Sequence, residues 1–164
     1  MKEFFLNFYT DSLNDCRTSI TNLVEYNPDA AYLDCGCDDG RFTMRVADAI
    51  GTRAVTGIEI NEEAAILASH VGVRVEGCDL NQRFPFSDRS LDVVTANQVI
   101  EHLYDTDGFV REIKRVLKPG GYAVISTNNL ASWHNLVSLA FGYQPFPADV
   151  SSDNPGLGKL VPTF

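Results

Sequence analysis

The sequence is poor in basic residues and has no long apolar run. Lys and Arg together number 13 against 22 Asp and Glu among 164 residues, which gives a formal net charge of −9. Proteins that bind nucleic acids usually carry a basic surface, so this balance argues against a direct nucleic-acid partner. A membrane-spanning helix needs about 18 consecutive apolar residues, and no stretch approaches that length, so no membrane partner is expected.

The sequence has four cysteines, which suggest neither a disulfide framework nor a metal site. They are Cys16, Cys35, Cys37 and Cys78. A chain of this length can bury an apolar core without disulfides. Cys35 and Cys37 lack the second Cys or His pair that a zinc site requires, so we interpret them as small apolar side chains at a strand end.

Residues 1–16 carry an early acid and no apolar run, unlike a signal peptide, so we expect a cytoplasmic location.

Short apolar segments alternate with amphipathic ones along the chain. This alternation favours an α/β fold in which helices cover a parallel sheet. A predicted helix over residues 11–26 precedes the first strand, and residues 1–142 are predicted to form the core. Residues 143–164 are rich in Pro, Gly, Ser and Asp without periodicity, which indicates an irregular tail or lid. The predicted strands cover residues 31–35, 54–60, 73–77, 91–97 and 122–127.

Glycines and acidic residues directly follow the predicted strands. In a sheet of this kind a ligand lies beyond the carboxyl ends of the strands, near the point where the strand order reverses. Glycines there let the backbone approach a ligand, and the N–H groups that open the next helix point at it. A carboxylate ending the second strand can accept both hydroxyls of a ribose, and one after the third can accept an adenine amino group. The residues at these positions are Asp34, Gly36, Asp38 and Gly40 after the first strand, Glu59 after the second, Asp79 after the third, and Asn97 and Gln98 after the fourth.

The turn after the first strand distinguishes between adenosine ligands. A nicotinamide-binding turn reads G-x-G-x-x-G and faces a pyrophosphate, whereas this turn reads Gly36-Cys37-Asp38-Asp39-Gly40. A carboxylate beside a pyrophosphate would add repulsion on the order of 1–4 kcal/mol at about 4 Å. The same carboxylates suit a ligand that carries a sulfonium and an ammonium group. The turn therefore favours S-adenosylmethionine over NAD, and an NAD-dependent oxidoreductase is the less favoured alternative.

Four segments follow one another in unbroken order over residues 30–129: AYLDCGCDDGRFT, TGIEIN, EGCDLNQRFPFSDRSLDVVTANQVIEHLYD and REIKRVLKPGGYAVISTNN. Together they resemble the class I S-adenosylmethionine-dependent methyltransferases of the methyltransferase-11-like group. The resemblance implies a Rossmann-like, doubly wound, mostly parallel sheet with strand order 3-2-1-4-5. It also implies S-adenosylmethionine as cofactor, S-adenosylhomocysteine as product, and methyl transfer by in-line displacement to a small-molecule acceptor.

The resemblance also assigns roles to residues by their position. Glu59 would bind the ribose, and Ile60 would pack on the adenine. Asp79 would meet the adenine amino group with the Leu80 backbone beside it, and Asn97 would line the pocket near the sulfonium. No metal ligand is implied. The residues of the first turn, which would shape and line the methionine end of the pocket, are Asp34, Gly36, Cys37, Asp38 and Gly40.

Some of these positions are open to other interpretations. The family usually has glycine at the position of Asp38. Asp tolerates a left-handed backbone better than most residues, so we expect the turn to survive, either with lower affinity or with the carboxylate used on the ligand's ammonium group. Asp34 could instead only cap the turn, and Glu59 and Asp79 could be solvated strand ends. His102 could face the acceptor as a base, or it could only begin a short helix.

Too few residues follow Ser126 for the helix and antiparallel hairpin that complete the family's sheet, so we expect this part of the fold to be missing. The fifth strand would then be an exposed edge, which a second copy could pair with to give a homodimer, or which the tail could cover. A strictly monomeric protein with a solvent-facing fifth strand would argue against this hypothesis. An active methyltransferase and a cofactor-binding domain without activity are both compatible with the sequence.

Overall fold

A computed structural model describes residues 14–129, 136 and 140 of the chain. The chain divides into two compact units, Met1–Thr127 and Asn128–Phe164, and the sheet with its helices belongs to the first. The predicted boundary at residue 142 and the predicted tail beyond it lie outside the described residues. In the described part, no helix is long and apolar enough to cross a membrane.

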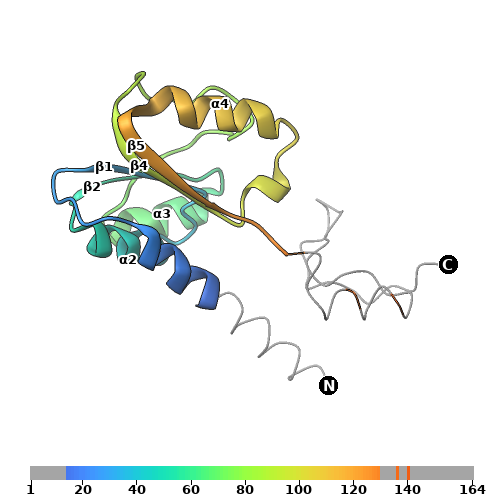
Figure 1. Cartoon of the computed structure of the whole chain (residues 1–164), viewed down its shortest axis with the longest axis horizontal. Helices are drawn as coiled ribbons and strands as arrows, with labels where there is room; N and C mark the ends of the chain where they lie inside the picture. The colour runs from blue at the N-terminus through green and yellow to red at the C-terminus, as the bar shows by residue number, and fades with distance from the viewer. Residues whose placement is uncertain (1–13, 130–135, 137–139, 141–164) are drawn as a thin grey trace. The chain divides into compact units, whose positions relative to one another are not determined.

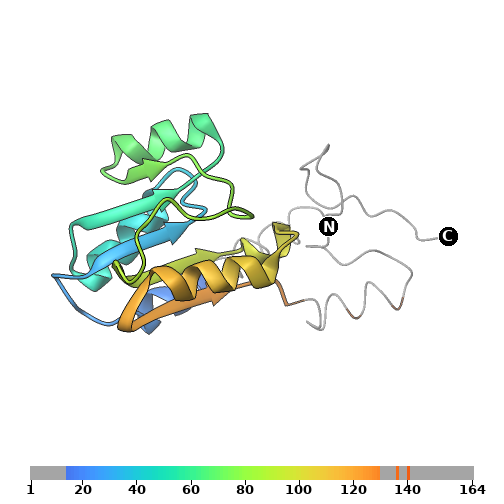
Figure 2. The same cartoon turned by 90° about the horizontal axis from the view of Figure 1, so that it is seen from above.

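Five parallel strands form the sheet in the order β3-β2-β1-β4-β5 (Figure 2). This is the predicted order. The chain runs outward from β1 to β3, returns to place β4 on the other side of β1, and then adds β5. The strand order therefore reverses beside β1, where an open α/β sheet binds its ligand. The strands are β1 (Ala31–Cys35), β2 (Ala54–Ile58), β3 (Arg74–Glu76), β4 (Leu91–Asn97) and β5 (Leu117–Ser126).

Helices cover both faces of the sheet (Figure 1). The helices α2 (Arg41–Ile50) and α3 (Glu62–His70) lie on one face, and α4 (Thr106–Val116) lies on the other. Successive side chains of a strand point to opposite faces. Tyr32 of β1 therefore belongs to the core on the α2 and α3 side, while Leu33 belongs to the core on the α4 side. Burial on both faces explains why the central strands β1 and β4 are mostly apolar, whereas the edge strands β3 and β5 carry more polar residues.

Local sequence signals set the ends of these helices. Asn61 caps α3, because its Oδ1 accepts a hydrogen bond from the backbone N–H of Ala64 at 3.0 Å. Gly51 ends α2 in a left-handed conformation, with a φ of 85°. Asp105 caps α4 by accepting from the N–H of Gly108 at 2.7 Å. A short 3₁₀ helix, η1 (Ile100–His102), lies between β4 and α4.

Two boundaries near the start of the fold differ from the prediction. The N-terminal helix ends at residue 23 rather than 26, and its predicted start lies outside the described residues. The strand β2 ends at Ile58 rather than at residue 60. The reason is that the Glu59 carboxylate accepts a hydrogen bond from the N–H of Asn61 at 2.9 Å, which turns the chain toward α3.

The fifth strand begins earlier than predicted. It starts at Leu117, which pairs with Leu91, and the next pair joins Tyr122 to Val93. The residues between these two pairs form an irregularity in which Gly120 has a φ of 87°. Within the described part of the chain, β5 pairs only with β4.

Candidate functional site

An open cleft of about 330 Å³ lies beyond the carboxyl ends of the strands. This volume is at the lower end of the range of roughly 300–1,000 Å³ that is typical of small-molecule sites. The cleft takes its lining from the segments after β1, β2, β3 and β4. The lining residues are Gly36, Ile58, Glu59, Ile60, Cys78, Asp79, Leu80, Asn81, Gln98, Val99, His102, Leu103 and Tyr104.

Six of the residues predicted from the sequence meet in this cleft. They come from segments up to 66 positions apart in the chain, yet the carboxyl ends of parallel strands meet at one edge of the sheet. The essential juxtaposition is a glycine after β1, a carboxylate after β2 and a carboxylate after β3. The six residues are Gly36, Glu59, Ile60, Asp79, Leu80 and His102.

The Glu59 carboxylate is held by backbone groups on both of its oxygens. Its Oε2 accepts a hydrogen bond from the N–H of Asp38 at 3.0 Å, and its Oε1 accepts from the N–H of Asn61 at 2.9 Å. Each carboxylate oxygen can accept more than one hydrogen bond, so both oxygens keep capacity for a ligand's hydroxyl groups. The side chain therefore fixes the bend after β1 and presents a negative charge to the cleft.

The bend after β1 has a left-handed backbone at three alternate positions. The φ angles are 76° at Gly36, 46° at Asp38 and 76° at Gly40. Asp38 thus adopts a left-handed conformation, which Asp tolerates better than most residues. At Gly36 a Cβ atom would lie 2.7 Å from Cγ2 of Val99, so glycine keeps this wall of the cleft open. Gly40 does not line the cleft.

The Asp79 carboxylate is oriented by its neighbour Asn81. Oδ1 of Asp79 accepts hydrogen bonds from the backbone N–H and from Nδ2 of Asn81, each at 2.9 Å. In the described part of the chain, no group donates to Oδ2 of Asp79. The second oxygen is consequently the one available to a donor in the cleft.

Two exposed apolar side chains lie at the cleft. Ile60 is 71% exposed and Tyr104 is 94% exposed, although both are large. A planar ligand between such side chains would remove their apolar surface from water. His102 also lines the cleft from η1, where its backbone N–H donates to the carbonyl of Val99 at 2.9 Å.

Asp34 is buried beneath the cleft and does not line it. The hydroxyl groups of Thr43 and Thr95 each donate to its carboxylate at 2.6 Å, and the Tyr32 hydroxyl lies 2.7 Å from that of Thr95. Burial raises the pKa of Asp34 to about 6, although the two hydroxyl hydrogen bonds lower it. Asp34 therefore joins β1, β4 and α2 through an internal polar network.

The pKa of Asp34 predicts a pH dependence of stability. Because its folded-state pKa of about 6 exceeds the ordinary value of 3.8, the folded protein binds more protons between these pH values. The free energy of unfolding should therefore fall as pH rises from about 4 to above 6, by on the order of 3 kcal/mol from this group. Asp34→Asn should lack this component, so its stability relative to the parent protein should rise over the same window.

Urea unfolding of both proteins at pH 4.5 and pH 7.5 would measure this difference. The exposed Asp48, which is paired with Arg53 at 3.1 Å, offers a matched control. Asp48→Asn should change the free energy of unfolding by less than about 1 kcal/mol at either pH. A stability difference for Asp34→Asn that stays constant with pH would contradict the assignment.

Three further predicted residues do not line the cleft. Cys37 is buried, with only 3% of its surface exposed. Asn97 is turned to its neighbours, since its Oδ1 accepts from the Ser126 hydroxyl at 2.8 Å and from the Cys16 thiol at 3.6 Å. Asp38 contributes its backbone N–H to Glu59 rather than its carboxylate to the lining. Their roles toward a ligand stay predictions.

The sequence prediction missed several lining residues. They lie close to predicted ones, so the signal that could have found them was sequence proximity to Glu59, to Asp79 and to the short helix η1. Gln98 was recognised as following the fourth strand but was not included in the predicted site. The missed residues are Ile58, Cys78, Asn81, Gln98, Val99, Leu103 and Tyr104.

Residues 33–125 match the methyltransferase domain family. The chain belongs to this family. The match covers more than half of the chain and includes the strand ends that form the cleft. Membership of this family argues against the alternative of an NAD-dependent oxidoreductase.

The methyltransferase domain is similar to several curated proteins. A probable S-adenosylmethionine-dependent methyltransferase of Mycolicibacterium smegmatis is 39% identical over 101 residues, which are 59% of this chain and 37% of that protein. The sterol 4-C-methyltransferase of Caenorhabditis elegans is 30% identical over 131 residues, 73% of this chain and 38% of that protein. The demethylmenaquinone methyltransferase of Staphylococcus epidermidis is 26% identical over 135 residues, 77% of this chain and 56% of that protein. The chain thus spans between about a third and just over half of these relatives.

Solved structures share the fold of the methyltransferase domain. The S-adenosylmethionine-dependent methyltransferase from Mesorhizobium loti has a TM-score of 0.62 at 22% identity, over 68% of this chain and 53% of that one. Geranyl diphosphate C-methyltransferase from Streptomyces coelicolor, in complex with Mg²⁺, geranyl diphosphate and S-adenosyl-L-homocysteine, has a TM-score of 0.61 at 20% identity, over 78% and 52% of the two chains. The predicted Rossmann-like fold and the methyltransferase family are thereby confirmed.

Proposed function

We propose that the methyltransferase domain binds S-adenosylmethionine in the cleft and transfers its methyl group to a small-molecule acceptor. The observation that carries this proposal is that Gly36, Glu59 and Asp79 line one cleft. S-adenosylmethionine supplies a methyl group on a sulfonium with a good leaving group, so the protein mainly has to position the two reactants and exclude water.

The residues of the cleft suit such a ligand. Glu59 would accept the ribose hydroxyls, because both of its oxygens retain acceptor capacity. Asp79 would accept the adenine amino group on its Oδ2, and Ile60 would cover a face of the base. The excess of carboxylates would attract the sulfonium and the ammonium group. The described residues 14–129, 136 and 140 contain no cluster of three His, Cys, Asp or Glu that could hold a metal ion.

His102 would act on the acceptor side of the cleft. A methyl acceptor needs a base only if it must lose a proton during transfer. His102 lines the same cleft as the proposed cofactor residues, and its imidazole would accept that proton. This role belongs to the proposal together with the predicted parts of Asp34, Cys37, Asp38, Gly40, Leu80 and Asn97 in shaping or lining the cofactor site.

Calorimetric titration with S-adenosylhomocysteine and with NAD tests the proposed cofactor. We expect S-adenosylhomocysteine to bind and NAD not to bind. Glu59→Gln should weaken S-adenosylhomocysteine binding by roughly 10- to 100-fold, because hydrogen bonds to a charged group are worth about 1.5–3 kcal/mol. The exposed Glu63, in the first turn of α3 and outside the cleft, provides the control Glu63→Gln, which should bind like the parent. Equal affinities for all three proteins would contradict the proposed site.

The acceptor can be sought with labelled S-adenosylmethionine. The names of the relatives specify a sterol and demethylmenaquinone, and a structural neighbour acts on geranyl diphosphate. Sterols, quinones and prenyl diphosphates are therefore the first candidates. Binding of S-adenosylhomocysteine without transfer to any acceptor would favour the alternative of a cofactor-binding domain without activity.

The proposal includes a cytoplasmic location and a homodimer. The four cysteines are free thiols, which is usual in a reducing compartment. The edge of β5 that faces away from β4 is the surface at which a second copy would pair, provided that no other segment covers it.

A further inference from the structure

Two separate segments form one wall of the cleft. Residues 78–81 follow β3, and residues 103–104 lead from η1 toward α4. Both line the cleft although more than 20 residues separate them in the chain. The position of this wall therefore depends on whatever joins the two segments.

The side chain of Asn81 makes this connection. Its Nδ2 donates to Oδ1 of Asp79 at 2.9 Å. Its Oδ1 accepts from the backbone N–H of Tyr104 at 2.9 Å and from that of Asp105 at 3.3 Å. The two backbone N–H groups can only donate, so the amide oxygen must face them and the amide nitrogen must face Asp79.

The connection determines what both segments present to the cleft. Asn81 occupies Oδ1 of Asp79 with two hydrogen bonds, which leaves Oδ2 as the oxygen for a ligand. It also holds the backbone of Tyr104, an exposed residue that lines the cleft. Through Asp105, which caps α4, the same amide is tied to a rigid helix.

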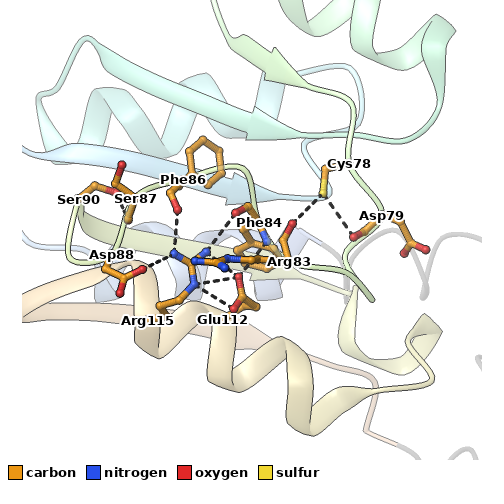
Figure 3. A network of polar contacts seen from close by, with 10 residues as sticks. All are labelled: Cys78, Asp79, Arg83, Phe84, Phe86, Ser87, Asp88, Ser90, Glu112 and Arg115. Carbon is orange, nitrogen blue, oxygen red and sulfur yellow. Dashed lines mark hydrogen bonds and ion pairs between the residues drawn. The ribbon is translucent and has the colours of Figure 1, made fainter.

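The far end of the loop after Asp79 is anchored to the same helix (Figure 3). Glu112 accepts from the N–H of Phe84 at 2.9 Å, and Arg115 donates to the Phe84 carbonyl at 3.0 Å. The loop is thus fastened to the last turns of α4 by this pair and to the first turn through Asn81. Of these two attachments, only the one through Asn81 involves a residue that would contact the ligand, namely Asp79.

We propose that Asn81 is a positioning residue for the adenine end of the cofactor, acting by fixing the Asp79 carboxylate and the Tyr104 segment together. This inference rests on the proposed function, because it needs Asp79 to receive the adenine amino group. It goes beyond that function because it assigns the orientation of the Asp79 carboxylate to the side chain of Asn81, which can act without contacting the ligand itself.

The test compares two nucleosides that differ at the position facing Asp79. S-adenosylhomocysteine has an amino group there, whereas S-inosylhomocysteine has a carbonyl oxygen that a carboxylate repels. We expect the parent protein to prefer the adenosyl compound by roughly tenfold or more, a difference of one charged hydrogen bond. In Asn81→Ala the preference should fall to less than about half of its parent value, since only the backbone N–H of residue 81 then holds the carboxylate and the Tyr104 segment is no longer tied to it.

Asn81→Asp separates the two links. It keeps an acceptor for the N–H groups of Tyr104 and Asp105 but replaces the donor to Asp79 by a second negative charge. We expect this variant to lose more of the nucleoside preference than Asn81→Ala does. Gln82→Ala, a substitution at the neighbouring exposed residue outside the cleft, should keep the parent's preference.

The outcomes distinguish this inference from the proposed function. If the parent protein does not bind S-adenosylhomocysteine, the proposed function fails. If the parent binds it with a clear preference over S-inosylhomocysteine and both Asn81 variants keep that preference, the positioning role fails. A purely structural role would lower the melting temperature and reduce binding of both nucleosides equally, which would also overturn it.

Discussion

Replacing Arg115 by methionine is expected to lower the free energy of unfolding by about 3–5 kcal/mol. The guanidinium binds the Glu112 carboxylate at 2.6 Å and donates to the carbonyls of Phe84 and Phe86 at 3.0 and 2.8 Å (Figure 3). The side chains of Arg115 and Glu112 are only 17% and 19% exposed. Methionine would fill part of the space but leave a largely buried carboxylate without its partner, which is the costly way to break such a pair.

Arg111 on the same helix provides the matched control. Its side chain is 70% exposed, and its only ion pair in the described part of the chain is with Asp105 at 3.7 Å. Arg111→Met should change the free energy of unfolding by less than about 1 kcal/mol. Urea denaturation followed by circular dichroism would measure both variants, and equal losses would show that Arg115 does not act as the loop's anchor.

The Arg115 effect should also fade in acid. The hydrogen bond from Arg115 is the main cause that lowers the pKa of Glu112, so the pair stabilises the protein above the ordinary pKa of that carboxyl group. This contribution is lost as pH falls through the folded-state pKa. The stability difference between the parent and Arg115→Met should therefore be smaller at pH 3 than at pH 7.

Gly40→Ala is expected to destabilise the protein by about 2–5 kcal/mol, combining backbone strain with overpacking. Gly40 has a φ of 76°, a conformation that L-residues rarely adopt. An added Cβ atom would lie 2.8 Å from Cα of Ala68 and 2.9 Å from Cγ2 of Val71. Because one of these atoms belongs to the backbone of α3, the strain can be relieved only by moving α2 and α3 apart.

Two other glycines separate the causes of this effect. At Gly120, φ is 87° but a Cβ atom would meet nothing within 4 Å, so Gly120→Ala should show strain alone, about 1–2 kcal/mol. At Gly77 neither problem exists, so Gly77→Ala should be within about 1 kcal/mol of the parent. Thermal unfolding should rank the three losses in this order. A Gly40→Ala loss no larger than that of Gly120→Ala would show that the close approach of the helices does not matter.

The sequence predicted the sheet well because its signals are local. Apolar runs separated by helical periods define strands, and the order 3-2-1-4-5 followed from the family resemblance. The convergence of Gly36, Glu59 and Asp79 was predictable too, since it requires only that parallel strands end at one edge. Where a strand began or ended was less predictable, as with Leu117, because hydrogen bonds to a neighbouring strand set those limits.

The direction of individual side chains was not predictable from the sequence. Asp34 and Asn97 stand at the ends of their strands like the cleft residues, yet one points into the interior and the other toward Ser126. Asn81 is an unremarkable polar residue in a loop until Tyr104, 23 positions later, comes within hydrogen-bonding distance. The family resemblance assigned Gly40 to the cofactor pocket, whereas in the structure the close approach of α3 requires a glycine at this position. Each of these depends on distances that only the folded chain creates.

The anchoring of the loop to α4 has a consequence for biosynthesis. Among the residues that the structure describes, the thirteen that line the cleft run from Gly36 to Tyr104, whereas Glu112 and Arg115 come later. A chain leaves the ribosome amino end first. A nascent polypeptide that has emerged only as far as Tyr104 carries all of these lining residues but lacks the two side chains that hold the loop after Asp79, so this loop is anchored only after translation has passed α4.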